Sequence, residues 1–294
     1  MLGKFVRFIR SGDTPSAQAS PWLSQVIDIV GKDIGDAGNF AATLSPAIDS
    51  ALAYFDRQIA SIPGPLPLSE QYFGVETGVA ALFPEAADIG RAIGRSLAVK
   101  EKLAELADDG HEEIHALLGM RLKPGHEPSA EQPTVFADHV LHSLAPGPAD
   151  TRETLRQAAF ERLLKNFAEH VEKLRRKQRL HKLEWEWNLQ HDAAKAMASD
   201  QNPEFVYADK ELTPDNLLRG LTAWLKTPEV FFQLKESPVS LPQAEGASSA
   251  AHVALPQLHC SDRRQWLVCL VRFSVAEGRQ ALQRESHTHR YIFI

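Results

Sequence analysis

The most constraining feature of this sequence is a stretch without proline or glycine that runs from residue 151 to residue 202. Within it, apolar residues recur at alternating steps of four and three, which is the spacing of a helix-packing seam. The seam residues are Phe160, Leu164, Phe167, Val171 and Leu174. We therefore predict one long helix over about residues 151–199, which spans roughly 70 Å at 1.5 Å per residue.

The second half of this predicted helix is apolar on two sides. The seam continues through His181 and Trp185, whereas a second set of apolar residues falls nearly opposite at 100° per residue. This second set is Leu180, Leu183 and Trp187. A helix that is apolar on two sides either passes between two layers or contributes a second interface. We expect the tryptophan end to pack between a helical part of the chain and a sheet.

A basic stretch, residues 173–182, precedes the tryptophans. Arg175, Arg179 and Lys182 share a side away from the seam, and Arg176 lies nearby. Such a surface is either a solvated charged face or a docking surface for an acidic protein, phosphate groups or RNA. The formal net charge of −6 argues against general attraction to nucleic acid, so we favour the solvated face.

The seam of the long helix needs an apolar partner. Residues 84–107 carry another helical stripe that begins at Ile89, and Gly90 with Gly94 favours close helix packing there. We expect these residues and the long helix to form an antiparallel hairpin within one chain. The alternative is that a second copy covers the seam, which would make the protein a homodimer.

Three pairs in which serine or threonine is followed by proline predict helix starts. The hydroxyl residue can cap the helix, and proline is favoured at the first helical position. They are Ser20-Pro21, Ser45-Pro46 and Thr213-Pro214. The segment "VFADHVLHSL", residues 135–144, is compatible with either a short helix or a strand.

The last third of the chain changes to the period of strands. In "RQWLVCLVRF", residues 264–273, both alternating faces are apolar, which predicts a central strand that is covered on both sides. Four further elements are predicted by pattern: strands in "VFFQL" (230–234) and "HVALPQL" (252–258), a helix in "VAEGRQALQRES" (275–286) and a strand in "RYIFI" (290–294).

These elements predict an α+β fold. The N-terminal two-thirds is mainly α-helical, and we expect a helical domain over residues 1–205 that includes the hairpin with the long helix. Residues 206–294 form a smaller α/β part with a mixed sheet, packed on the helical domain.

One short motif has a chemical meaning. "HEEIH", residues 111–115, fits H-E-x-x-H and so resembles the zinc-dependent metallopeptidases. The resemblance implies that His111 and His115 bind Zn²⁺ from one face of a helix and that Glu112 activates a water molecule. We expect a short helix from Asp109 to Leu118 here. A zinc-dependent hydrolase is therefore one alternative function, with zinc as its cofactor.

The remaining features indicate a non-exported protein. Lys4, Arg7 and Arg10 interrupt the apolar residues of the N-terminus, so no signal peptide is expected, and residues 2–10 offer at most weak peripheral contact with a membrane. Cys260 and Cys269 form neither a disulfide framework nor a metal-binding spacing. We predict a cytoplasmic protein.

No motif for binding nucleotides is present in the sequence. We therefore predict a non-enzymatic interaction, regulatory or scaffold protein without a cofactor, organised by its long helix. Its partner is an unidentified protein or a second copy. A nucleic-acid-associated protein that uses the basic stretch is the second alternative, after the zinc hydrolase.

Overall fold

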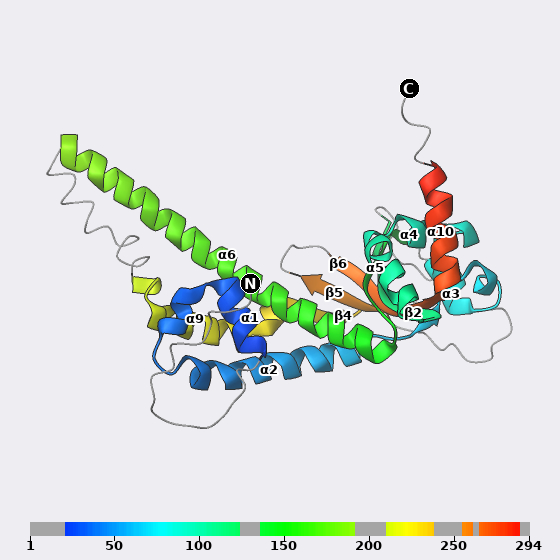
Figure 1. Cartoon of the computed structure of the whole chain (residues 1–294), viewed down its shortest axis with the longest axis horizontal. Helices are drawn as coiled ribbons and strands as arrows, with labels where there is room; N and C mark the ends of the chain where they lie inside the picture. The colour runs from blue at the N-terminus through cyan, green and yellow to red at the C-terminus, as the bar shows by residue number, and fades with distance from the viewer. Residues whose placement is uncertain (1–20, 124–135, 192–209, 238–254, 261–264, 289–294) are drawn as a thin grey trace.

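The computed structural model describes residues 21–123, 136–191, 210–237, 255–260 and 265–288. In these residues a six-stranded sheet is covered by helices on both faces (Figure 1). The predicted α+β class is confirmed, with a long helix before residue 205 and a sheet-bearing C-terminal part after it.

The sheet is antiparallel along its main path. Its strands follow the order β3 (Phe136–Ala145), β2 (Glu113–Leu122), β6 (Gln265–Ser274), β5 (Pro256–Cys260) and β4 (Phe232–Glu236). The short strand β1 (Leu66–Pro67) pairs in parallel with the second half of β6. The predicted strand over residues 264–273 is confirmed as the central one. Of the predicted strands at 230–234 and 252–258, residues 232–234 belong to β4 and residues 256–258 to β5, while residues 252–254 lie outside the described residues.

Both faces of β6 are buried, as the alternation predicts. Leu267, Cys269 and Val271 belong to the core on one face of the sheet, whereas Val268 and Leu270 belong to the core on the other. Side chains alternate along a strand, so the part of a central strand that lies between two helical layers is apolar at successive positions.

The first face is covered by four helices: α3 (Thr77–Leu82), α4 (Ala86–Arg95), α5 (Leu97–Asp108) and α10 (Val275–Thr288). The helix predicted over residues 275–286 is thus confirmed. The residues that we expected to form one helix over 84–107 form two, because the chain is extended at Ser96. The Ser96 hydroxyl accepts a hydrogen bond from the backbone N–H of Val99 at 3.3 Å and so caps α5.

The second face is covered by α1 (Pro21–Val30), α2 (Phe40–Ala60), α6 (Pro148–His191) and α9 (Pro214–Leu225). The long predicted helix is α6, and residues 192–199 of the prediction lie outside the described residues. The seam residues Phe160, Leu164, Phe167 and Val171 pack into this core with α1, α2 and α9. The predicted hairpin partner is therefore wrong, since α4 and α5 lie on the opposite face of the sheet.

Two of the three predicted helix starts are confirmed, because α1 begins at Pro21 and α9 at Pro214. The start at Ser45-Pro46 is wrong. Helix α2 already begins at Phe40, and its first turn includes a hydrogen bond from the Thr43 N–H to the Asn39 carbonyl at 2.9 Å. Pro46 lies inside the helix near its N-terminus, where a missing N–H removes only one backbone bond.

The predicted short helix over residues 109–118 is also wrong. Residues 113–122 form β2, and the ambiguous residues 135–144 belong largely to β3, its antiparallel partner. Both strands precede residue 205, yet β2 pairs with β6 along eight consecutive residues of each strand. The division at residue 205 stays a prediction, but the sheet joins the two parts of the chain by hydrogen bonds.

Three short 3-10 helices complete the described structure: η1 (Lys32–Asp36), η2 (Glu70–Tyr72) and η3 (Pro228–Val230). The predicted C-terminal strand at 290–294 and the N-terminal residues 2–10 lie outside the described residues. In the part of the chain that is described, no helix combines the length and the apolar character needed to cross a membrane.

Candidate interaction surface on the long helix

Helix α6 consists of two segments in different surroundings. Its first segment, residues 148–174, packs on α1 and α2 through the seam. Its second segment, residues 175–191, extends away from the sheet and forms the far end of the molecule in Figure 1. We call residues 175–191 the distal segment of α6.

Arg175 marks the start of the distal segment. Its guanidinium donates one hydrogen bond to Asp33 in η1 and another to Glu172 on α6, each at 2.9 Å. The hydrogen bond from Arg175 lowers the pKa of Glu172. With 28% of its side chain exposed, Arg175 connects α6 to η1 and is not a free cation of the basic stretch.

The other predicted basic residues differ in their ion-pair partners. Arg179 lies 3.9 Å from Glu172, while Arg176 and Lys182 are exposed and form no ion pair with any residue that the structure describes. Arg176 and Lys182 lie about 120° apart around the helix at 100° per residue. Arg175, Arg179 and Lys182 share one side of α6, as their spacing predicts, but Arg175 and Arg179 already contact acidic residues there.

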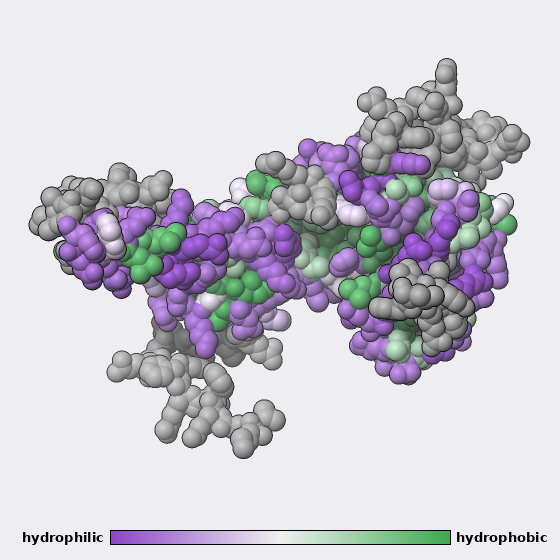
Figure 2. All heavy atoms as spheres, turned by 90° about the horizontal axis from the view of Figure 1, so that it is seen from above, coloured by the Kyte–Doolittle hydropathy of each residue, from purple (hydrophilic) through white to green (hydrophobic). Residues whose placement is uncertain are grey.

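A line of large apolar side chains runs along the distal segment. Leu180 is 56% exposed, Leu183 is 61% exposed and Trp187 is 61% exposed. We call these three residues the distal stripe. Figure 2 shows hydrophobic atoms within an otherwise hydrophilic surface at this end of the molecule. The imidazole of His191 stacks on Trp187 with ring centroids 4.4 Å apart, which supports one orientation of the indole.

The opposite side of the distal segment continues the seam. His181 is buried and Trp185 is partly buried, as their spacing from Val171 and Leu174 predicts. The two-sided pattern is thus present, but the expectation that the tryptophan end packs between a helical part and the sheet is wrong. The sheet lies beside the other end of α6 (Figure 1), so the distal stripe has no layer of the described structure over it.

The "HEEIH" motif does not lie on a helix. Glu113 and His115 are in β2, and His111 and Glu112 precede the strand. The one-turn spacing that brings two histidines to one zinc ion is therefore absent. The His115 side chain is buried, with its Nε2 3.7 Å from a Glu113 oxygen.

No group of three or more His, Cys, Asp and Glu side chains in the described residues is arranged to hold a metal ion. The helix expected at this motif is wrong because β2 takes its conformation from pairing with β3 and β6. The zinc site that the resemblance implies depends on that helix.

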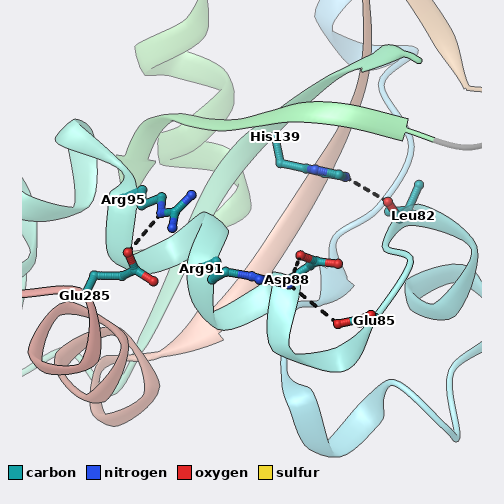
Figure 3. Close-up of polar contacts among 7 residues, drawn as sticks. All are labelled: Leu82, Glu85, Asp88, Arg91, Arg95, His139 and Glu285. Carbon is teal, nitrogen blue, oxygen red and sulfur yellow. Dashed lines mark hydrogen bonds and ion pairs between the residues drawn. The ribbon is translucent and has the colours of Figure 1, made fainter. Parts of the chain in front are cut away.

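His139 has a structural contact instead of a metal-binding one (Figure 3). Its Nε2 donates a hydrogen bond to the Leu82 carbonyl at 2.8 Å, and its ring stacks on Phe83 with centroids 4.3 Å apart. Burial lowers the pKa of His139, since the charged imidazolium loses hydration there. His139 is therefore a hydrogen-bonded histidine that contributes to the fold.

A hollow of about 430 Å³ opens where β1, η2 and the start of α10 meet. Charged side chains in its wall already have partners within the protein. Arg272 pairs with Glu113 at 2.5 Å, and Glu277 accepts hydrogen bonds from the N–H and the hydroxyl of Ser274 at the start of α10. These contacts stabilise the end of the sheet and the N-terminal cap of α10. Each charged side chain in the wall of the hollow is therefore already paired within the described structure.

The distal stripe also has charged neighbours that sequence reasoning did not select. Lys177, Glu184 and Glu186 are exposed on the distal segment, beside the three apolar residues. The signal that could have identified them is their position, since they flank a 3-4 apolar repeat as charged residues flank the seam of a coiled coil.

Comparison of this chain with protein families, with curated proteins and with solved structures finds no match. The distal stripe is therefore interpreted from its own residues.

Proposed function

We propose that this protein is a non-enzymatic interaction or scaffold protein and that the distal segment of α6 is the surface through which it binds another protein chain. One observation carries the proposal: Leu180, Leu183 and Trp187 are each more than half exposed and lie on one line of a projecting helix. Large apolar residues that gather on an exposed surface are typical of binding sites, and tryptophan is enriched among the residues that dominate binding energy.

The proposal agrees with how the rest of α6 is used. Its first segment has an apolar face packed on α1 and α2, so it holds the distal segment in a defined direction. Arg175 strengthens this hold through Asp33. A surface that is already helical loses less conformational entropy on binding than a segment that must first fold.

The two alternative functions have less support. A zinc-dependent hydrolase needs His111 and His115 one helical turn apart, whereas His115 lies in β2 and His111 precedes that strand outside any helix. Nucleic-acid binding through the basic stretch needs several free cations on one side, whereas Arg175 is engaged by Asp33 and Glu172. We also propose a cytoplasmic location and no cofactor; the free, buried Cys269 thiol is compatible with a reducing compartment.

Site-specific photo-crosslinking tests the proposed function. Benzoylphenylalanine replaces Leu183 in the full chain, produced at its natural level in cells, and illumination is followed by mass analysis of covalent adducts. We expect a protein adduct, with either a second copy or another protein. The matched control replaces Lys165, an exposed residue of the first segment, and gives no adduct. If the probe at Lys165 gives the same protein adducts as the probe at Leu183, the distal stripe is not a binding surface.

A further inference from the structure

The distal stripe belongs to a pattern of four residues. Arg176, Leu180, Leu183 and Trp187 recur at steps of four, three and four. This is the spacing of the positions that face a partner helix in a coiled coil. Arg176 is exposed like the other three, so the line extends for three helical turns without cover from the described structure.

The flanks of this line carry charges in a definite order. On one flank stand Lys177 and Glu184, and on the other stand Arg179 and Glu186, seven residues apart in each case and all exposed. Each flank is therefore basic toward the body of the protein and acidic toward the end of the helix. A surface with this order is complementary to itself when two copies meet in opposite directions.

We propose that the occupant of the distal stripe is a second copy of this chain, bound antiparallel through residues 176–187 of both copies. The inference rests on the proposed function and names the partner for it. The two-fold axis passes between Leu180 and Leu183, so that Leu180 contacts the partner's Leu183 and the reverse contact is equivalent.

In an antiparallel pair of helices, equivalent flanks of the two copies meet. This register brings Lys177 to the partner's Glu184 and Arg179 to the partner's Glu186, and symmetry repeats both ion pairs. To form this ion pair, Arg179 gives up its 3.9 Å contact with Glu172. Both side chains are more than half exposed, so the loss of that contact costs little free energy.

The same register gives Arg176, the one charged residue within the line, a favourable partner. Arg176 lies opposite the partner's Trp187, where a guanidinium over an indole gains from a cation–π interaction. A parallel pair would instead place Arg176 against the partner's Arg176, and two like charges within a helix interface repel. The antiparallel arrangement is therefore the one that the charges favour.

The geometry of the molecule is compatible with this arrangement. The line lies on the side of α6 away from the seam, so a partner helix does not compete with α1 or α9 for it. Residues 176–187 span about 18 Å at 1.5 Å per residue. A contact of this length is at the small end of protein interfaces, so we expect reversible dimerisation at roughly micromolar concentrations.

Sedimentation velocity on the purified full-length protein tests the inference, over concentrations from about 1 to about 300 µM. We expect the weight-average mass to rise from 32.6 kDa toward twice that value. The variant Leu180→Asp/Leu183→Asp stays monomeric throughout. Both positions are exposed, so this variant retains the circular dichroism spectrum and the melting temperature of the parent protein.

Charge reversal tests the register. Glu184→Lys/Glu186→Lys places like charges on both flanks and shifts association to at least tenfold higher concentration. Adding Lys177→Glu/Arg179→Glu to the same chain reverses the sign of all four flanking charges and restores association. Failure of this exchange to restore the dimer would overturn the proposed register.

Disulfide trapping tests the direction in a Cys260→Ser background. Oxidation of an equimolar mixture of Leu180→Cys and Leu183→Cys proteins is expected to give mainly the mixed dimer, since these positions face each other only in the antiparallel pair. Preferential linkage of each variant to itself would mean a parallel pair.

A constant monomeric mass at all concentrations would overturn the self-association inference. The proposed function is judged separately by the photo-crosslink. A monomer that still gives an adduct with another protein at Leu183 would retain the function with a different occupant, whereas a monomer without any adduct would reject both.

Discussion

The body of this protein, a sheet between two layers of helices, and the distal segment of α6 place the same types of residue in different surroundings. In the body, Phe160 is fully buried and meets Trp22 edge to face, with ring centroids 4.9 Å apart. On the distal segment of the same helix, Leu183 and Trp187 are mostly exposed. The difference teaches that an apolar residue at helical spacing predicts a contact surface, while the surrounding elements decide whether that surface is core or interface.

The largest expected difference between the two regions is the loss in free energy of unfolding when one aromatic residue of each is replaced by alanine. Phe160→Ala removes a fully buried ring and should lower the free energy of unfolding by about 3–5 kcal/mol, through lost burial and the cavity that remains. Trp187→Ala should change it by less than about 0.5 kcal/mol, because the indole contributes little to the core. Urea denaturation measures both. A loss above about 2 kcal/mol for Trp187→Ala would mean that the distal segment is part of the core.

Two glycines of α4 test how tightly the body is packed. A Cβ at Gly94 would lie 2.5 Å from the Ala281 carbonyl oxygen of α10, so Gly94→Ala should destabilise the protein by about 1–3 kcal/mol. At Gly90 the nearest atom, at 2.6 Å, is the end of the flexible Glu70 side chain, which can move. Gly90→Ala should therefore change stability by less than about 1 kcal/mol. Equal melting temperatures for the two variants would contradict the close approach of α4 and α10.

The pH dependence of stability should separate the body from the distal segment. The pKa of His139 is lowered by burial in the folded state, so below the ordinary value of 6.5 the unfolded chain binds this proton first. The free energy of unfolding should therefore fall as the pH drops through 6.5, until the folded state also binds the proton. His139→Gln should weaken this dependence, and Trp187→Ala should leave it unchanged. Chemical denaturation at several pH values between about 5 and 8 measures the effect.

The smallest effect concerns the junction between the two regions. Arg175→Ala removes the hydrogen bonds to Asp33 and Glu172 and should cost up to about 1 kcal/mol, since the Asp33 carboxylate is largely exposed. The neighbouring substitution Arg176→Ala should leave stability unchanged, because Arg176 has no ion pair within the described structure. A larger loss of stability for Arg176→Ala than for Arg175→Ala would contradict the assignment of Arg175 as the residue that connects α6 to η1.

Much of the secondary structure was predictable because each element carries its own signal. The seam from Phe160 to Val171, the two-sided strand at 264–273 and the start of α9 at Pro214 follow from local spacing and capping. The packing role of Gly94 also follows from its sequence context, since α4 and α10 approach closely there. The class of the fold follows from the order of these elements.

The failures have a common physical cause. We expected a short helix over residues 109–118, yet hydrogen bonds to β3 and β6 make residues 113–122 a strand. The partner of the seam was mistaken for the same reason, because the apolar stripes of α1, α2, α4 and α5 are interchangeable as patterns. Contacts between distant residues override weak local preferences.

For the candidate site, the sequence by itself determined that the end of α6 is apolar on two sides and where its charges stand, since both depend only on spacing along a helix. Only the tertiary structure decided that one of these sides is exposed and that Arg175 is engaged by Asp33. The reason is that exposure depends on which elements meet in space, and the sheet meets the opposite end of α6.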